Sequence, residues 1–394
     1  MIKYTGLAIC IICLISCNAS SSSESTVTLP DPFLFESGAR MTSVDEWPAR
    51  RAEIAVLAQQ YELGEKPAAP EAVAGIFSQV TANDVTASKI TVTVANDGKT
   101  GSFDCNITYP ASGTSPYPAV IGLGYSNLNN AQLLGLGVAV ITFPNDDVAN
   151  QNSASSRGQG LFYDFYGSDH SAGALIAWAW GVSRLIDALE TTPSAGIDAA
   201  HLAITGCSRN GKGALIIGAF DERIALTIPQ ESGAGGAASW RVSQWQKNKG
   251  QNVQTLRQIV TENCWFRESF SSYGSAVDDL PFDHHMIEAL CAPRGLLVIE
   301  NTSMEWLGNR STWVNSNTAH LVWEALGAGE RMGYSQIGHG DHCGLPQSQE
   351  PDVEKFVRRF LLSDVTADTN IMRTDGRYGY DAADWTDWTV PVLE

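Results

Sequence analysis

The sequence is poor in basic residues for its length. Its 394 residues include 25 Lys and Arg against 43 Asp and Glu, so the formal net charge is -18 at pH 7. Nucleic-acid binding depends on Lys and Arg that neutralise phosphates, and this balance therefore argues against a nucleic-acid partner. The surface as a whole would also repel a polyanionic ligand, so local cations would have to bind it.

The hydrophobic run at the N-terminus is short. Residues 7–15 follow Lys3 and are too few to cross a membrane as a helix, which is typical of a secretory signal. The run ends in Leu14-Ile-Ser-Cys17, which matches the bacterial lipoprotein box with Cys17 as the lipidated residue. We therefore predict a signal peptide over 1–16, a Ser-rich tether over 17–29 and an outer-membrane lipoprotein whose side of the membrane stays open. An ordinary signal peptide cleaved within 19–26 is the alternative.

Metal-binding patterns are absent outside this leader. No Cys-x-x-Cys pair and no Cys/His cluster there has the spacing of a metal site, and His284 and His285 do not easily reach one ion. Export would place the chain in an oxidising compartment. Five cysteines remain after the leader, so at least one thiol should be unpaired; they are Cys105, Cys207, Cys264, Cys291 and Cys343.

Short apolar runs alternate with helical segments along the chain. Alternating apolar and polar residues predict an antiparallel pair at a sheet edge, over 88–94 and 102–109. Nearly continuous apolar runs predict buried parallel strands at 119–122, 137–143, 202–206, 225–228 and 295–300. Helices are predicted at 44–61, 172–189, 212–220, 312–326 and 353–362. This alternation predicts an α/β fold with a doubly wound sheet and one catalytic domain over 30–394, on which the tail from 366 packs.

One of these apolar runs ends in a glycine-flanked serine. The stretch from His201 to Ala214 reads as a strand, a sharp turn at Ser208 and then a helix, which predicts a nucleophile elbow. Asn210 stands where the usual Gly-x-Ser-x-Gly pattern has its second glycine, and Gly211 comes one residue later. Taken alone, the motif therefore also fits an ordinary turn.

A serine nucleophile needs a histidine base. His342 is preferred over His339 because it adjoins Cys343, and a disulfide from Cys343 to Cys207 would bring it beside Ser208. His339 would then be a residue that shapes the loop.

The base in turn needs an acid, and two glutamates are candidates. In open α/β sheets ligands bind beyond the carboxyl ends of the strands. Glu231 follows the strand that ends near 228 and lies in a glycine-rich turn, whereas Glu305 follows the strand that ends near 300. We expect Glu231 to orient the histidine, with Glu305 as the rival acid.

Cations and tryptophans complete the candidate site. Arg209 follows the serine directly and could stabilise an oxyanion together with its own backbone N–H, while Lys212 could bind a sugar hydroxyl or a carboxylate. Flat aromatic faces suit sugar rings, although most of the 11 tryptophans should pack in the core. The candidates for such a contact are Trp240, Trp265 and Trp306.

Four motifs taken together resemble the glucuronoyl esterases of carbohydrate esterase family 15. They are Gly206-Cys-Ser-Arg-Asn-Gly-Lys-Gly213, Pro229-Gln-Glu-Ser-Gly-Ala-Gly-Gly236, residues 162–173 and Gly338-His-Gly-Asp-His-Cys343. The resemblance implies an α/β-hydrolase fold, a three-layer sandwich with a mostly parallel sheet. It also implies hydrolysis of the ester that joins glucuronic or 4-O-methyl-glucuronic acid of xylan to lignin alcohols, through an acyl-serine intermediate and without a metal or an organic cofactor.

The resemblance also assigns roles to residues. It implies that Ser208 is the nucleophile, His342 the base, Glu231 the acid and Arg209 the oxyanion-stabilising arginine. The positions that would hold the uronic-acid hydroxyls are Lys212, Gln254, Glu262 and Trp306. The Cys207–Cys343 pair is similar to a bridge of fungal members, whereas the pairing of Cys105, Cys264 and Cys291 stays open, as does an acid role for Glu305.

Two other functions remain open at this point. One is another carbohydrate esterase on the same fold, such as an acetyl xylan or feruloyl esterase, although a uronate-binding set makes little sense for an acetyl group. The other is a surface lipoprotein that binds glycan without catalysis. The substrate we expect is glucuronoxylan or a lignin–carbohydrate ester, acted on by a monomer whose alcohol preference the sequence leaves open.

Overall fold

The computed structural model describes residue 1, residues 27–82 and residues 85–394. The predicted signal peptide after its first residue, Cys17 and most of the predicted tether lie outside these described residues. Within the described part, no helix is both long enough and apolar enough to span a membrane.

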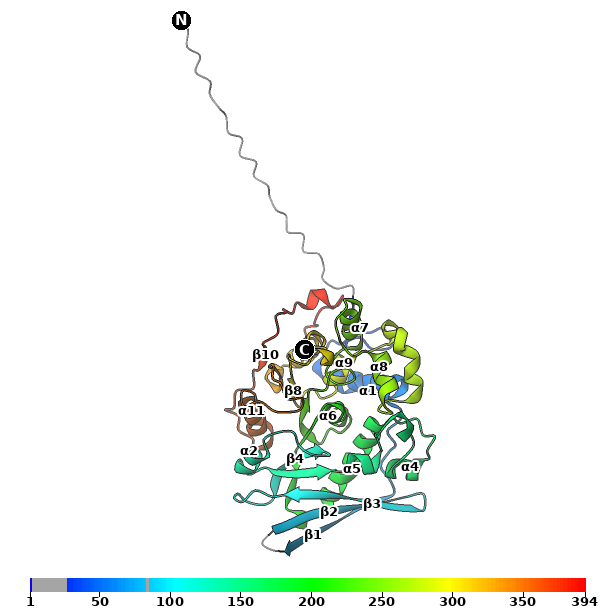
Figure 1. Ribbon diagram of the computed structural model, residues 1–394, viewed down its shortest axis with the longest axis vertical. Helices are drawn as coiled ribbons and strands as arrows, with labels where there is room; N and C mark the ends of the chain where they lie inside the picture. Colours follow the sequence, from blue (N-terminus) through cyan, green and yellow to red (C-terminus); the bar gives the residue numbers. More distant parts are fainter. Residues whose placement is uncertain (2–26, 83–84) are drawn as a thin grey trace.

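One twisted sheet organises the fold (Figure 1). Its strand order is β1-β2-β3-β5-β4-β6-β7-β8-β9-β10. Neighbours from β1 to β5 pair antiparallel, and all pairs from β5 through β4 to β10 are parallel. The strands are β1 (Ala72–Ala82), β2 (Val85–Asn96), β3 (Lys99–Thr108), β4 (Tyr117–Leu123), β5 (Ala139–Phe143), β6 (Ile197–Cys207), β7 (Ile224–Gln230), β8 (Gly295–Glu300), β9 (Met332–Gln336) and β10 (Met372–Thr374).

Helices cover both faces of this sheet and make three layers. One face packs against α1 (Trp47–Ala58), α5 (Ala174–Thr191), α6 (Arg209–Phe220), α9 (His284–Ala289) and α10 (Asn309–Ala325), and the other against α2 (Asn130–Gly135) and α11 (Glu350–Leu361). Successive strand residues point to opposite faces, so Ile121 joins the larger core and Val120 the smaller one. The predicted α/β fold with an antiparallel edge is confirmed.

Shorter helices connect these layers. They are α3 (Asn145–Val148), α4 (Leu161–Tyr166), α7 (Trp240–Asn248) and α8 (Leu256–Glu262). Figure 1 shows β1, β2 and β3 at the end of the molecule opposite α7. Helix α8 matters for the site, because it lies between β7 and β8 in the chain and forms one wall of the pocket described below.

The ends of the folded body differ from the prediction in two places. Leu29, placed in the tether, is fully buried, and its N–H donates to the Trp385 carbonyl at 2.8 Å. The folded body therefore includes residue 29, because the C-terminal segment offers it an apolar contact. That segment also adds β10, a strand that was not predicted and that pairs parallel with β9.

Candidate active site

The turn between β6 and α6 places Ser208 in a strained backbone conformation. Its φ is 58° and its ψ is -124°, and its N–H donates to the Gln230 carbonyl at 2.9 Å. A Cβ on Gly206 would come within 2.5 Å of the Asn210 carbonyl oxygen, and one on Gly211 within 2.5 Å of the Gln230 oxygen. Both positions therefore need glycine for the chain to turn this sharply.

Asn210 explains the departure from the usual serine motif. Its Nδ2 donates to the Leu123 carbonyl at 2.9 Å, so the side chain ties the start of α6 to the end of β4. Its Oδ1 accepts from Gln151 Nε2 at 3.2 Å. The close approach that would need glycine falls at Gly211 instead, one residue later.

Glu231 and His342 form a pair beyond the ends of β7 and β9, between which β8 lies in the sheet. Glu231 lies directly after β7 and is fully buried. Its backbone N–H donates to the Ile299 carbonyl at 2.7 Å. Its Oε2 lies 2.7 Å from Nδ1 of His342, whose side chain is 30% exposed. The geometry lets the carboxylate orient the ring and leaves the other ring nitrogen free to meet a hydroxyl.

Glu305, the rival acid, takes no part in this pair. It lies in the short 3-10 turn Glu305–Leu307 after β8 and is exposed to solvent. Its carboxylate has no hydrogen-bond or ion-pair partner among the described residues. The structure therefore brings Glu231, and not Glu305, to the histidine.

A single pocket of about 350 Å³ collects the predicted site residues. Ile259 and Trp265 line it together with Ser208, Arg209, Lys212, Gln254, Glu262, Trp306 and His342. The Trp306 and His342 rings meet edge to face with their centroids 4.7 Å apart. Trp240, another candidate sugar contact, is instead fully buried in the larger core, because its Nε1 reaches the buried carboxylate of Glu62 at 3.2 Å.

Trp265 forms a platform for the two cations. The Arg209 guanidinium lies 5.6 Å and the Lys212 ammonium 5.7 Å from its ring centroid, within the range of cation–π contacts. Trp265 Nε1 donates to Gln151 Oε1 at 2.9 Å, so the ring is held from behind. The sequence offered no signal for Gln151, since it depends on a loop that packs from elsewhere in the chain.

Lys212 is a buried lysine with little water around it. Its Nζ donates to the carbonyls of Ser232 at 2.5 Å and Ala234 at 2.8 Å. Burial lowers the pKa of Lys212 to about 8, although the carboxylates of Glu262 and Glu300 oppose this change. An ammonium has three N–H donors, so one remains for a ligand.

Glu300 is a site residue that the sequence reasoning missed. It ends β8 fully buried, and one carboxylate oxygen accepts from the Ser232 N–H at 3.0 Å and from the Ser232 hydroxyl at 3.3 Å. Burial raises the pKa of Glu300 to about 8, and the charge of Glu231 adds to the increase. The only signal in the sequence was an acidic residue that closes a fully apolar run.

The Cys207–Cys343 disulfide joins the elbow to the histidine loop. It spans 136 residues of sequence and sets the two Cα atoms 5.6 Å apart. The predicted pair is therefore formed, whereas Cys105, Cys264 and Cys291 are buried free thiols.

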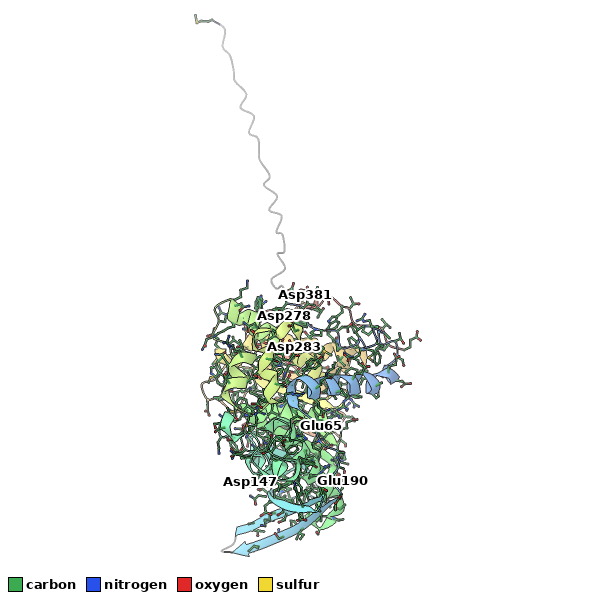
Figure 2. All side chains as sticks on the ribbon, turned by 90° about the vertical axis from the view of Figure 1, so that its right-hand side faces the viewer. Glu65, Asp147, Glu190, Asp278, Asp283 and Asp381 are labelled. Carbon is green, nitrogen blue, oxygen red and sulfur yellow. A yellow bond between two sulfur atoms is a disulfide. The ribbon has the colours of Figure 1, made fainter. Side chains whose placement is uncertain are left out.

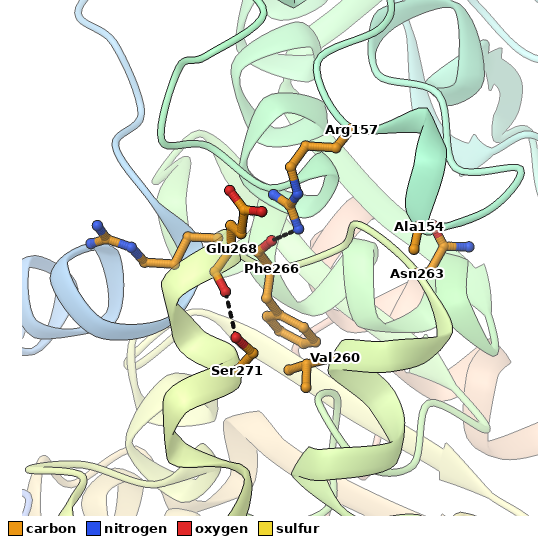
Figure 3. A pocket seen from close by; sticks show the side chains of 8 residues that line it. Ala154, Arg157, Val260, Asn263, Phe266, Glu268 and Ser271 are labelled. Carbon is orange, nitrogen blue, oxygen red and sulfur yellow. Dashed lines mark hydrogen bonds between the residues drawn. The ribbon is translucent and has the colours of Figure 1, made fainter.

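A second cavity, of about 250 Å³, also has a residue of α8 in its lining (Figure 3). Its lining includes Val260 and Asn263 of this region, whereas Ile259 and Glu262 face the first pocket. Arg157 donates from Nη2 to the Phe266 carbonyl at 2.9 Å, as Figure 3 shows. This contact supports the segment that carries Trp265, and the cavity contains none of the predicted site residues.

Comparison with known proteins places the chain in a family. A family model described as "Glucuronyl esterase, fungi" matches residues 92–327. The 4-O-methyl-glucuronoyl methylesterase of Podospora anserina is 49% identical over 368 residues, which cover 93% of this chain and 74% of that protein. The chain belongs to the glucuronoyl esterase family. The resemblance predicted from the four motifs is thus confirmed.

Solved members of the family share the whole fold. The glucuronoyl esterase catalytic domain of Hypocrea jecorina matches with a TM-score of 0.87 and 47% identity, over 95% of this chain and 99% of the other. A serine-to-alanine variant of the Sporotrichum thermophile enzyme, solved with methyl 4-O-methyl-β-D-glucopyranuronate, matches with a TM-score of 0.86 and 44% identity, over 93% and 96%.

Proposed function

We propose that this protein is a serine esterase that hydrolyses esters of glucuronic acid or 4-O-methyl-glucuronic acid. The observation that carries the proposal is the shared pocket, where the Ser208 elbow and the Glu231–His342 pair face a set of polar side chains suited to a sugar. Gln254 and Glu262, 3.4 Å apart, offer an amide and a carboxylate to sugar hydroxyls. The names of the relatives, 4-O-methyl-glucuronoyl methylesterases, support the same substrate class.

The reaction is acyl transfer in two steps. His342 takes the proton from the Ser208 hydroxyl as its oxygen attacks the ester carbonyl, and the tetrahedral intermediate collapses when His342 returns that proton to the leaving alcohol. Water then attacks the glucuronoyl-serine with the same base, which releases the free uronate and restores Ser208. The balance needs only ester and water.

The oxyanion of both intermediates needs donors at the start of α6. The Arg209 backbone N–H follows the serine at a helix N-terminus, and the guanidinium of Arg209 lies against Trp265 in the same pocket. Lys212, Gln254, Glu262 and Trp306 hold the sugar. Glu231 keeps the His342 ring in the tautomer that accepts a proton at the other nitrogen.

The test compares acyl groups on the purified protein. We expect methyl and benzyl glucuronate to be hydrolysed faster than acetylated xylan or feruloyl esters, and Ser208→Ala to lower kcat by at least roughly 10⁴-fold. Faster turnover of an acetyl or feruloyl ester would assign the pocket to another carbohydrate esterase. Full activity of Ser208→Ala would exclude the acyl-serine route.

The proposal for location is export with a lipid anchor on Cys17. It is supported by the lipoprotein box at Leu14-Ile-Ser-Cys17 and by the disulfide, which favours an oxidising compartment. We expect radiolabelled palmitate to be incorporated in a bacterial host and Cys17→Ala to abolish the label. Release of the unlabelled wild type into the soluble fraction would contradict the anchor.

A further inference from the structure

The carboxylate of Glu231 faces a second histidine. His339 Nε2 lies 3.2 Å from Glu231 Oε1, whereas His342 Nδ1 lies 2.7 Å from the other oxygen, Oε2. The Glu231 carboxylate is fully buried, and the His339 side chain is only 13% exposed. Two histidines therefore bracket one carboxylate that water does not reach.

Both atoms of the His339 contact lack another partner. Glu231 Oε1 and His339 Nε2 are within hydrogen-bond distance of each other, but the ring N–H does not point at the oxygen. Neither atom forms a hydrogen bond with any other described residue. A buried charged oxygen without a donor is costly. Hydrogen bonds of empty active sites are often poorly aligned and tighten once substrate is bound. A small turn of the ring would satisfy both atoms at once.

The backbone fixes the loop that carries His339. Its N–H donates to Asn301 Oδ1 at 3.1 Å, and Asn301 Nδ2 donates back to the His339 carbonyl at 3.1 Å. The preceding Gly338 N–H donates to Asp375 Oδ2 at 2.8 Å, and Ile337 N–H to the Glu300 carbonyl at 3.1 Å. The position of the ring beside Glu231 is thus set by the end of β8, independently of His342.

The other charged groups near Glu231 do not supply the missing donor. Glu300, from β8, is a second acidic group, so it offers no donor to Glu231, and its carboxylate accepts its own hydrogen bonds from Ser232. The Lys212 ammonium, from α6, donates two of its hydrogen bonds to the carbonyls of Ser232 and Ala234. Of the charged side chains described, only the two histidines make a close contact with the Glu231 carboxylate.

We propose that His339 is a positioning residue for the esterase reaction: it donates from Nε2 to Glu231 Oε1 and holds this carboxylate in the orientation that His342 needs. The inference rests on the proposed function. Without His339, Oε1 has no donor, and His342 alone holds the carboxylate in position. Substrate contacts are unchanged, because His339 does not line the pocket.

Two substitutions separate the donor from the bulk of the ring. His339→Leu removes the donor and should lower kcat roughly 10-fold, the effect of an unpaired buried group, with little change in KM. It should also move the acid limb of the pH profile of kcat/KM to higher pH. The Glu231 carboxylate then interacts with His342 alone and favours the imidazolium form of that ring more strongly. His339→Gln keeps an N–H at similar reach and should restore most of kcat. His201→Leu, which removes a surface histidine paired with Asp198 at 2.8 Å, is the matched control and should change neither quantity.

A double-mutant comparison tests whether His339 acts through Glu231. In a Glu231→Ala background, His339→Leu should add no further loss of kcat. An equal loss in both backgrounds, or a His339→Gln variant as impaired as His339→Leu at unchanged thermal stability, would overturn the proposal.

A measurement without substrate keeps this inference separate from the proposed function. The NMR titration of ¹⁵N-labelled His342 should shift its midpoint to higher pH in His339→Leu and stay near the wild-type midpoint in His339→Gln. If the wild type fails to hydrolyse glucuronate esters, the proposed function fails, and the ring titration still decides on His339. An unchanged His342 titration in His339→Leu would contradict the proposed role.

Discussion

Backbone strain gathers at three residues of the site. Ser208, Glu231 and Cys343 adopt positive φ values of 58°, 43° and 72°, in a region of backbone conformation that residues other than glycine rarely occupy. Each such residue costs about 1–3 kcal/mol and persists only where its surroundings hold it. The disulfide holds Cys343, and the hydrogen bonds to Gln230 and Ile299 hold the other two. Side-chain placement in the site thus depends on the turns after β6 and β7.

The choice of acid is the first prediction at the scale of the residue. Glu231→Ala removes the group 2.7 Å from His342 and should lower kcat by roughly 10³- to 10⁴-fold, as loss of a triad acid does in other serine hydrolases. Glu305→Ala, the control on an exposed side chain, should stay close to wild type. Steady-state kinetics on benzyl glucuronate decide between them. A collapse of turnover in Glu305→Ala alone would make Glu305 the acid.

The second prediction at this scale concerns the pH dependence of substrate binding. Burial lowers the pKa of Lys212 to about 8, so the ammonium loses its proton as the pH rises through this value, well before an ordinary lysine does. The loss of a charged donor should raise KM roughly 5- to 10-fold between pH 7 and pH 9, whereas a Lys212→Met variant should have a high KM at every pH. Steady-state kinetics at each pH, corrected for uncatalysed ester hydrolysis, measure this change in KM.

Lys66 offers the matched control for this effect. Burial also lowers its pKa to about 8, but its ammonium donates to Ser183 Oγ and the Phe220 carbonyl, away from the pocket. Lys66→Met should leave the pH profile of KM unchanged. A wild-type KM that stays constant up to pH 9 would show that Lys212 does not bind substrate through its charge.

At the scale of the element, the disulfide connects the end of β6 to the loop after β9. The bridge closes a long stretch of chain, so Cys207→Ala/Cys343→Ala should lower the free energy of unfolding by roughly 2–5 kcal/mol. It should also lower kcat, because His342 precedes Cys343 directly. Urea denaturation and kinetics of the double variant test this. Cys105→Ala, which alters a buried free thiol, is the control and should leave kcat unchanged. If Cys105→Ala lowered kcat as much as the double variant does, the loss of activity would reflect lower overall stability and not the position of His342.

A buried ion pair links α9 to the segment after α1. His284 Nε2 lies 2.9 Å from Glu62 Oε1, with both side chains fully buried. Burial by itself lowers the pKa of His284, but the attraction and hydrogen bond of Glu62 outweigh it and the net change raises the pKa above the ordinary value. A raised pKa means that the pair stabilises the fold fully below about pH 6.5 and loses this contribution as the pH rises through the raised value.

Urea denaturation between pH 6 and pH 9 measures this dependence. Wild-type stability should fall towards pH 9, and Glu62→Gln should lose roughly 3–5 kcal/mol at pH 6 because it leaves the histidine unpaired. The partly exposed His201–Asp198 pair gives the control, and Asp198→Asn should cost at most about 1 kcal/mol. A stability that rises from pH 6 to pH 9 would assign the neutral form to His284.

Sequence patterns predicted elements where burial repeats regularly. The run at 295–300 became β8 residue for residue, since every position is buried. Strand β1 was missed because Ile76 and Val80 are exposed, which blurs the apolar face, and β10 was missed because three residues carry no period.

The same limit applies to the site. Strand ends predicted Ser208, Glu231 and His342, because the carboxyl ends of parallel strands meet at one edge. They left the choice between Glu231 and Glu305 open, since the turn geometry after each strand decides it. Glu300, Gln151 and the His339 contact act through packing between distant segments, for which the sequence has no local pattern.

At the scale of the whole molecule, acidic residues outnumber basic ones, 43 against 25. Of the acidic residues labelled in Figure 2, Asp283 is buried, and the other five are exposed and lie at several levels between Asp381 at the top and Glu190 near the strands at the bottom. The formal net charge is -18. The pocket itself carries the cations Arg209 and Lys212 beside Glu262. Long-range repulsion and local attraction therefore act together on an acidic polymer.

Salt separates these two effects. Partly esterified glucuronoxylan keeps free uronates and is a polyanion, so the surface should repel it over about 30 Å at 0.01 M salt but only about 8 Å at 0.15 M. We expect KM for the polymer to fall several-fold over this range, while KM for the uncharged benzyl glucuronate stays constant and controls for effects of salt on the site. The rate at saturating polymer should not change, because repulsion acts on encounter and not on the acyl-transfer step. A polymer KM that rises with salt would mean that the cations of the pocket outweigh the surface, and that free uronates beside the ester are themselves bound.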